Sequence, residues 1–276
     1  MIALCNGDWK EERMKVQVLV AAMNQYDHSL LDKMNIDSDV IVGNQCEMNS
    51  VERFRYKNHQ VVYLNFNEVG VGLNRNNALM RATGDICLFA DDDMVYVQNY
   101  NEIILSAFEM NPKADVIIFN LYEEHPSRYV ITKKQKVNRF NYLRYGTARI
   151  AIRLSSVRKN GIYFNQCYGG GTIHSHGEDN IFLTQCLNAK MNIYAMPSYI
   201  AKLTEERNST WNQGYSDKYI WDQGCLYKTI SSRWWGLLCL QDAVRHRRMY
   251  NKSFWNVFIM MIKGAINEDH SFDERL

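Results

Sequence analysis

Residues 86–94 read ICLFADDDM, an apolar run that ends directly in three consecutive aspartates. Residues 86–90 have the length and composition of a strand that is covered on both faces, as in a parallel sheet flanked by helices. Asp91, Asp92 and Asp93 follow without a turn residue. Because adjacent like charges repel and desolvating a carboxylate is costly, this cluster needs a cation, hydrogen-bond donors or open water.

Segments of similar pattern lie on both sides of this strand. We expect further buried strands at residues 15–22, 39–42, 60–64 and 115–121, and helices near residues 29–34, 73–82 and 100–110. Strands that alternate with helices predict an α/β fold with a mostly parallel central sheet flanked by helices. Ligands of such sheets bind outside the carboxyl ends of the strands, which is where the three aspartates lie. Their position therefore favours a functional site.

The composition limits the classes of function. Across 276 residues, 32 Lys and Arg stand against 30 Asp and Glu, so we expect no nucleic-acid partner. Cys87, Cys186 and Cys239 lie in apolar segments and the sequence has no CxxC pair, which favours reduced core thiols and a cytoplasmic location. The first residues are too polar for a secretory signal and no run of about 18 apolar residues occurs, so we expect a soluble or peripheral protein.

The last third of the chain has a different pattern. Residues 232–249 and 253–266 are apolar, helical in pattern and rich in Trp with adjacent Arg. We expect residues 216–276 to form a helical extension of a main domain at residues 1–215. Two explanations of the apolar pattern remain open: the helices pack against the α/β domain, or they lie on a membrane surface, where Trp and Arg are favoured.

Two blocks of the sequence resemble the family-2 glycosyltransferases with the GT-A fold. Residues 70–94, GVGLNRNNALMRATGDICLFADDDM, match the donor-site segment of this family in order at Gly72, Leu73, Arg75, Asn76, Gly84, Asp85, Asp91 and Asp93. Residues 161–183 match its later glycine-rich segment and its Glu-Asp pair, here Glu178 and Asp179. The similarity covers roughly residues 16–211. It implies a Rossmann-type GT-A domain that moves a sugar from a nucleotide diphosphate sugar to a hydroxyl, as in bacterial polysaccharide or glycolipid synthesis.

The resemblance also implies roles for individual residues. Asp179 would be the base that takes the proton of the acceptor hydroxyl, and direct displacement with one base inverts the anomeric configuration. Asp91 and Asp93 would hold Mn²⁺ or Mg²⁺, because hard cations prefer carboxylate and phosphate oxygens and stabilise the leaving diphosphate. Contacts to the donor are expected from Ala22, Asn24, Gln45, Arg75, Asn76, Asp91, Asp92, Gly170 and Glu178.

One departure from the family pattern concerns the nucleotide base. The family usually has an acidic residue after the second strand, whereas this chain has IVGNQCE at residues 41–47. The amides of Asn44 and Gln45 offer both donors and acceptors to a uracil edge, so we expect a UDP-sugar donor. The expected acceptor is a glycan or a lipid-linked molecule, which would place the enzyme in the cytoplasm, at or near the inner face of the cell membrane.

Several alternatives remain open at this point. One is that Glu178 or Asp179 has no catalytic role and simply caps a helix. Another is that Arg75 is a solvated helix residue. His174 and His176 form an HxH pair that could reach the metal, although loop histidines are usually not ligands.

Two other functions are also considered. Sugar-nucleotide pyrophosphorylases have a related fold, but residues 18–27, VLVAAMNQYD, lack their glycine-rich basic signature. A catalytically silent sugar-nucleotide-binding or membrane-scaffold protein is disfavoured by the intact acids.

Overall fold

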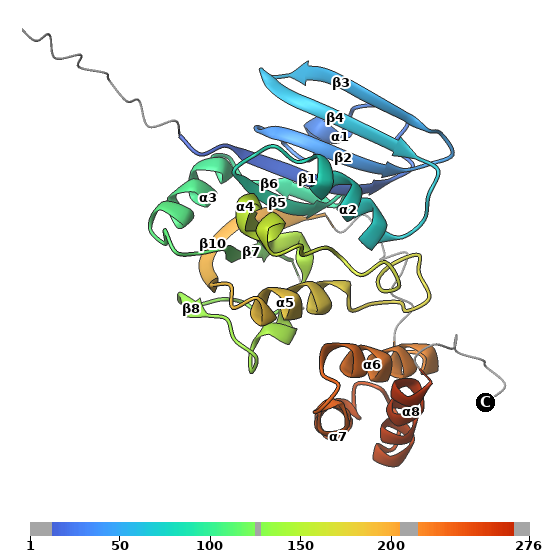
Figure 1. The fold of residues 1–276 in the computed structure, drawn as a ribbon. Helices are drawn as coiled ribbons and strands as arrows, with labels where there is room; N and C mark the ends of the chain where they lie inside the picture. The colour runs from blue at the N-terminus through green and yellow to red at the C-terminus, as the bar shows by residue number, and fades with distance from the viewer. Residues whose placement is uncertain (1–12, 125–127, 205–214, 268–276) are drawn as a thin grey trace, which may run out of the picture.

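A mixed sheet of ten strands forms the centre of the computed structural model, which describes residues 13–124, 128–204 and 215–267 (Figure 1). The strands are β1 (Val16–Met23), β2 (Asp39–Gln45), β3 (Ser50–Tyr56), β4 (His59–Phe66), β5 (Ile86–Asp91), β6 (Met94–Tyr96), β7 (Val116–Tyr122), β8 (Gln135–Lys136), β9 (Ile150–Arg153) and β10 (Ile193–Leu203). Their order is β3-β4-β2-β1-β5-β9-β7-β10-β6, with β8 beside β10.

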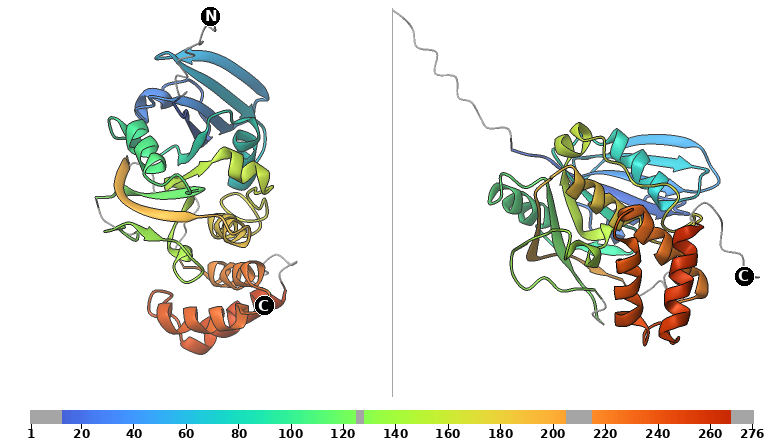
Figure 2. Two further views of the ribbon diagram at one scale, coloured as in Figure 1. Left: turned by 60° about the vertical axis from the view of Figure 1, so that its left-hand side comes forward. Right: turned by 60° about the horizontal axis from the view of Figure 1, so that its bottom comes forward.

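Helices cover both faces of this sheet and form a separate group at the C-terminal end (Figure 2). They are α1 (Leu30–Lys33), α2 (Val71–Arg81), α3 (Tyr100–Glu109), α4 (Leu154–Lys159), α5 (Glu178–Asn188), α6 (Asp217–Ile230), α7 (Trp235–His246) and α8 (Phe254–Ile266), with the short 3-10 helices η1 (Tyr142–Arg144) and η2 (Thr147–Arg149). The helices predicted near residues 29–34, 73–82 and 100–110 correspond to α1, α2 and α3, and those of the last third to α7 and α8.

Strands β4, β2, β1 and β5 run parallel side by side, and all five predicted strands are confirmed. Alternate residues of these strands point to opposite faces, as the period of a strand requires. Leu19, Ile41 and Phe89 join the core under α2, α4 and α5. Val18 and Val40 join the core under α1 and α3. Burial on both faces explains why these strands are continuous apolar runs.

The structure adds antiparallel strands to this parallel block. Strand β9 lies between β5 and β7 and is antiparallel to both, and β10 pairs in parallel with β7. Strand β3 forms the outer edge as a hairpin with β4, and the turn residues Lys57 and Asn58 both have positive φ, as a type I′ turn requires. β3 carries Glu52, Arg53 and Arg55, so its polar pattern gives no sign of a buried strand, but suits an exposed edge.

The C-terminal helices α6, α7 and α8 form a bundle below the sheet (Figure 1). α6 and α8 touch at their backbones, since a Cβ on Gly224 would lie 1.9 Å from the carbonyl oxygen of Met261. α6 also contacts α5, so the bundle packs on the α/β domain. None of the described helices has both the length and the apolar run needed to cross a membrane. The domain boundary expected at residue 215 adjoins residues 205–214, which lie outside the described residues. The same is true of residues 1–12 of the expected main domain and of residues 268–276 of the expected extension.

Candidate active site

The acidic triplet lies where the parallel strands end. Asp91 is the last residue of β5 and pairs in register with Ala21 of β1. The segment after β1 lies against the triplet, since Asp92 Oδ2 accepts hydrogen bonds from Gln25 Nε2 at 3.2 Å and from the Met23 amide at 3.4 Å. The carboxyl ends of β1 and β5 therefore meet at this site, as expected for a ligand-binding crevice in an open α/β sheet.

Arg75 joins the triplet to the Glu-Asp pair. This α2 residue is 5% exposed, and its guanidinium donates from Nη2 to Asp91 Oδ1 at 2.7 Å and from Nη1 to Glu178 Oε1 at 2.9 Å. Burial opposes the charge of Arg75, but the two carboxylates outweigh that effect and raise its pKa above the usual value. The fork of a guanidinium suits such a bridge, and the alternative of a solvated helix arginine is wrong.

Asp93 lies in an environment that disfavours its negative charge. Burial, with the added negative charge of Asp91 and Asp92, raises the pKa of Asp93 to about 6. Its Oδ1 atom is buried and has no hydrogen-bond partner among the described residues. The backbone carbonyl of Asp93 accepts from the amide of Thr204 at 2.8 Å, so this residue is held in place through its main chain.

Asp179 lies in the first turn of α5, next to Glu178. Burial raises the pKa of the Asp179 carboxyl to about 7; the charge of Glu178 adds to the shift and Arg75 opposes it. The N-cap of α5 is Gly177, with φ of 109°, and neither acid occupies that position. Among the described residues, Oδ1 of Asp179 accepts a hydrogen bond only from the amide of the neighbouring Asn180, at 2.8 Å. Helix capping therefore does not account for an aspartate at this position.

The glycine-rich segment closes around Glu178. A Cβ on Gly169, whose φ is +101°, would lie 2.9 Å from the carboxylate of Glu178 and 2.5 Å from a methyl group of Val71. The carbonyl of Gly170 accepts from the Val71 amide at 3.0 Å, so this segment also meets the first turn of α2. The glycines thus let the backbone approach Glu178 and α2 closely, while a donor contact for Gly170 stays a prediction.

Three other residues expected in the donor site lie at the ends of β1 and β2. The Ala22 side chain is buried in the core, so this residue can offer a ligand only its backbone. Asn24 is exposed, with φ of 52°, and its amide donates to the Gln45 carbonyl at 2.9 Å. Gln45 Oε1 accepts from the Gly70 amide at 2.8 Å, which fixes the turn that leads into α2.

Two amides have roles that differ from those expected. Asn76 donates to the Phe164 carbonyl at 2.9 Å and accepts from the Phe164 amide at 2.8 Å, so it holds the loop after α4 instead of facing a donor. Asn44 donates to Gln25 and Asn65 and accepts from Gln25, and it is fully buried. A contact of Asn44 with uracil is therefore wrong, because its carboxamide is already taken up.

Gln25 was not expected at the site. Its Nε2 atom donates to Asp92 and to the Met23 carbonyl, which aligns the segment after β1 with the triplet. The sequence signal for Gln25 is the polar stretch at residues 24–28, directly after β1. The segment after a parallel strand lies at the same sheet edge as the segment after its parallel neighbour, here the triplet after β5. The contact itself follows only from the pairing of β1 with β5.

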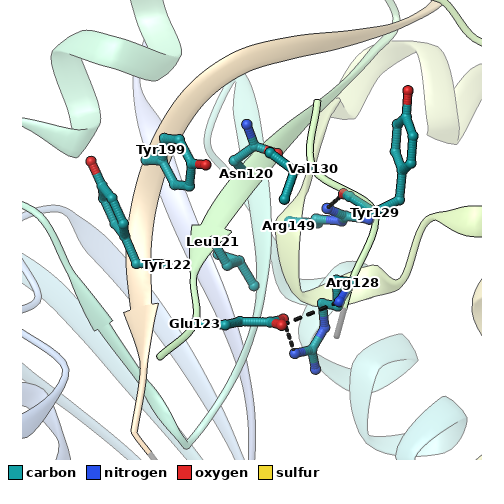
Figure 3. Close-up of a pocket in the computed structure, with 9 residues that line it drawn as sticks. All are labelled: Asn120, Leu121, Tyr122, Glu123, Arg128, Tyr129, Val130, Arg149 and Tyr199. Atoms are coloured by element: carbon teal, nitrogen blue, oxygen red, sulfur yellow. Dashed lines mark hydrogen bonds and ion pairs between the residues drawn. The ribbon is translucent and has the colours of Figure 1, made fainter. Parts of the chain in front are cut away.

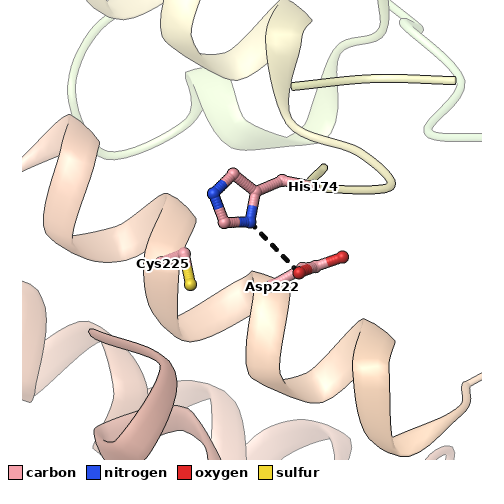
Figure 4. A group of neighbouring side chains, drawn as sticks. All are labelled: His174, Asp222 and Cys225. Atoms are coloured by element: carbon pink, nitrogen blue, oxygen red, sulfur yellow. Dashed lines mark hydrogen bonds and ion pairs between the residues drawn. The ribbon is translucent and has the colours of Figure 1, made fainter. Parts of the chain in front are cut away.

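The two histidines of the HxH pair turn away from the triplet. His174 Nδ1 lies 3.2 Å from Oδ1 of Asp222 on α6 (Figure 4). His176 Nε2 lies 2.8 Å from Oε1 of Gln223, the next residue of that helix. His174, Asp222 and Cys225 each offer a metal-ligand atom within 4.8 Å of the others. Asp222 also accepts from Lys218 Nζ at 2.7 Å, so its charge is already balanced. We assign this group to the contact between the bundle and the segment before α5.

The comparisons with known proteins agree with this geometry. The model of the family described as "Glycosyl transferase family 2" matches residues 16–165. A search of curated proteins finds no match. Among solved structures, the chain is similar to S. aureus TarS 1-349 in complex with UDP-GlcNAc, with a TM-score of 0.62, 16% identity and 90% of each chain covered.

The same protein in complex with UDP gives a TM-score of 0.59 at 16% identity, covering 94% of this chain and 93% of that one. The likeness shows the GT-A fold, including a central sheet flanked by helices. Because the family model covers more than half of the 276 residues, this chain belongs to glycosyl transferase family 2.

Proposed function

We propose that this glycosyltransferase is an inverting, metal-dependent enzyme that moves a sugar from a UDP-sugar to a hydroxyl of a glycan or lipid-linked acceptor in surface polysaccharide synthesis. One observation carries the proposal: Arg75 binds Asp91 and Glu178 together, beside an Asp179 whose pKa is raised to about 7. Perturbed carboxylates gathered at a sheet edge are typical of a catalytic site. Family membership favours sugar transfer over the nucleotidyl transfer of pyrophosphorylases.

A UDP-sugar is the donor that the observations support best. The similar S. aureus TarS has been solved with UDP-GlcNAc and with UDP. In this chain, Gln45 and the backbone around Asn24 lie at the end of β2 and β1, on the same edge as the triplet. We assign the base and ribose to this end, and the diphosphate to the side of Asp91, Arg75 and Asp93.

A divalent cation fits the triplet. Asp93 has a buried carboxylate oxygen without a hydrogen-bond partner among the described residues, and the pKa of Asp93 is raised to about 6 by burial and by its acidic neighbours. Arg75 is shared with Glu178, so it cannot fully neutralise the cluster. Asp91 and Asp93 would hold Mn²⁺ or Mg²⁺, and Asp92 would support the site through its bond to Gln25. Such a cation supplies positive charge to the leaving diphosphate.

Asp179 is assigned as the base. A carboxylate with a pKa near 7 is a better proton acceptor than an ordinary aspartate and is still largely ionised slightly above neutral pH. Glu178 and Arg75 hold the first turn of α5 against the triplet, which fixes the distance between base and donor. One base on one face of the sugar supports a single displacement, and therefore inversion.

We also propose that the enzyme works in the cytoplasm at the inner face of the membrane, where a lipid-linked acceptor would be presented. α7 and α8 expose apolar side chains, among them Val244 (58%) and Trp255 (66%). Between residues 228 and 267 the one acid, Asp242, is buried, whereas seven residues are basic: Lys228, Arg233, Arg245, Arg247, Arg248, Lys252 and Lys263. Exposed apolar side chains together with an excess of basic residues suit an anionic lipid surface.

A donor screen tests the proposed function. The full chain is incubated with Mn²⁺ and a panel of nucleotide sugars, and release of nucleoside diphosphate is measured with and without glycan acceptors. We expect release from a UDP-sugar, and little from GDP- or CMP-sugars. Binding of a UDP-sugar without transfer to any acceptor would instead support the silent binding protein.

A further inference from the structure

A cavity of about 70 Å³ lies at the carboxyl end of β7, beside β10 (Figure 3). Its walls include Tyr122 at the end of β7, Glu123 directly after it, Arg128, Arg149 of η2, and Tyr199 of β10. A water molecule needs roughly 10–15 Å³ by this kind of measure, so the cavity has room for a group of several atoms, such as a phosphate or a carboxylate.

Arg149 is a buried cation without a matching anion. Its side chain is 2% exposed, and its guanidinium donates to two backbone carbonyls, those of Tyr129 at 2.9 Å and Arg144 at 3.1 Å. Its Nε atom is buried and has no hydrogen-bond partner, and no carboxylate within the described ranges forms a salt bridge with it. Because burying a charge without an ion partner is costly, this arrangement favours an anionic ligand.

A second arginine adds positive charge to the same cavity. Arg128 forms an ion pair with Glu123, and the Arg128 side chain is 46% exposed. Burial and the charge of Arg128 both lower the pKa of Arg149, so the two guanidinium groups repel each other. Two arginines with one glutamate leave a net positive charge in the lining, which an anion would neutralise.

The segment that leads into the cavity passes the proposed base. Three residues before Arg149, Gly146 lies against Asp179, since a Cβ there would be 3.3 Å from Asp179 Oδ2. Three residues span at most about 10 Å of chain, so Arg149 and its cavity lie near the base.

Two tyrosines extend this wall toward solvent. The rings of Tyr122 and Tyr199 stack at 4.1 Å, and Tyr122 is half exposed. Stacked aromatic rings offer an apolar surface with polar hydroxyl ends, which suits a ligand that is partly apolar and partly polar. A sugar that carries an anionic group has this mixed character.

We propose that this cavity is an acceptor subsite that binds an anionic group, a phosphate or a carboxylate, and so brings the acceptor hydroxyl to Asp179. The inference rests on the proposed function and deepens it by naming the charge of the acceptor. Arginine is the side chain best suited to recognise either anion, because its fork can form two parallel hydrogen bonds.

Calorimetric titration of the full chain tests the subsite without knowledge of the natural acceptor. Inorganic phosphate, glucuronate and neutral glucose are titrated in EDTA, so that no metal recruits the anions to the acidic triplet. We expect an affinity on the order of millimolar for the anion that matches the acceptor, and none for glucose. Tighter binding of phosphate or of glucuronate identifies which anion the acceptor carries.

Three variants assign the binding to the cavity. Arg149→Gln and Arg128→Gln should each weaken anion binding by at least about tenfold, since a charge-assisted hydrogen bond is lost. Arg139→Gln is the matched control, because Arg139 is exposed and bonds to Asn188 away from the cavity. Melting curves show whether Arg149→Gln folds, and if it does not, the exposed Arg128→Gln decides.

Two results would overturn the subsite: anions that bind no better than glucose, or anion affinities unchanged in both cavity variants. A separate titration with UDP and Mn²⁺ reports on the donor site. Absent anion binding with normal UDP binding removes only the subsite. Absent UDP binding with anion binding that depends on Arg149 would leave an anion site in the cavity, but would remove the proposed function and with it the acceptor role of that site.

Discussion

Nη1 of Arg75 lies 2.9 Å from Oε1 of Glu178, although 103 residues separate them in the chain. The same guanidinium holds Asp91 at 2.7 Å, so one buried side chain ties the end of β5 to the start of α5. The acidic triplet and the Glu-Asp pair thereby become one site.

Replacing Arg75 tests the bridge. Arg75→Lys keeps the charge, but an ammonium lacks the planar fork that reaches two carboxylates at once. We expect kcat/KM to fall by about 10² or more and the melting temperature to drop, because a buried charge network is broken. Arg81→Lys, in the exposed last turn of the same helix, is the control. Near-normal turnover of Arg75→Lys would mean that the bridge does not organise the site.

The metal prediction concerns the triplet. Asp93→Asn should remove most activity and weaken Mn²⁺-dependent binding of UDP, while the melting temperature stays close to that of the wild type. The fold should tolerate the change because it removes a like charge from a buried cluster. Asp92→Asn should cause a smaller loss. Full turnover in EDTA would contradict metal dependence.

The base prediction separates an enzyme from a donor-binding protein. Asp179→Asn should keep the affinities for UDP-sugar and metal, while kcat falls by about 10² or more, the usual scale for loss of a general base. The amide conserves the size of the side chain, so unfolding of α5 would not explain a loss. The anomeric configuration of the product should be opposite to that of the donor. Normal turnover, or retention of configuration, would refute the assignment.

The raised pKa of Asp179 predicts a pH dependence of activity. The base works only when it is ionised, so kcat/KM should rise with pH and level off above a midpoint near 7. This is measured with saturating metal across pH 5.5 to 8.5, and Asp179→Asn should lack the midpoint in its residual rate. An acid limb with a midpoint near 4 would place the base elsewhere.

The same shift predicts how stability depends on pH. The pKa of Asp179 is about 7 in the folded state, against 3.8 as its usual value, so the folded state binds this proton more tightly. The free energy of unfolding therefore declines as pH rises from about 4 to 7. Asp179→Asn removes this cost, so its melting temperature should exceed that of the wild type at pH 8 and not at pH 4. Equal differences at both pH values would contradict the raised pKa of Asp179.

The membrane proposal predicts binding that depends on lipid charge. In sedimentation with vesicles, the full chain should bind when acidic lipid is present, and binding should fall as salt rises, because salt screens the attraction. Trp255→Ser with Ile259→Ser on α8 should weaken it, whereas Val69→Ser, an exposed apolar residue outside the bundle, should not. Failure to bind at any salt concentration would leave α7 and α8 free for a protein partner or a second copy of this chain.

Local pattern was sufficient for the elements that are buried on both faces. β1, β2, β4, β5 and β7 are apolar runs because helices cover them from two sides, and such runs are visible without a structure. The same holds for the acids at positions 91, 93, 178 and 179, whose order along the chain carried the family resemblance. Strand β3 was not predicted, because an exposed edge strand of alternating charges lacks an apolar signal.

Only the tertiary structure decided which polar groups meet. Asn44 and Asn76 look like ligand-binding amides in the sequence, yet they bond to backbone groups of Gln25 and Phe164. His174 and His176 look like metal ligands, yet they face α6, which follows them by more than 40 residues.

Residue type and spacing therefore determined the fold class, the family and the acids of the site. The pairing of Arg75 with Glu178, the placement of Gly146 against Asp179, and the outward faces of α7 and α8 depend on contacts between distant segments. Such contacts arise because every buried polar group needs a partner, and the identity of that partner is settled by how the elements pack, which no local pattern encodes.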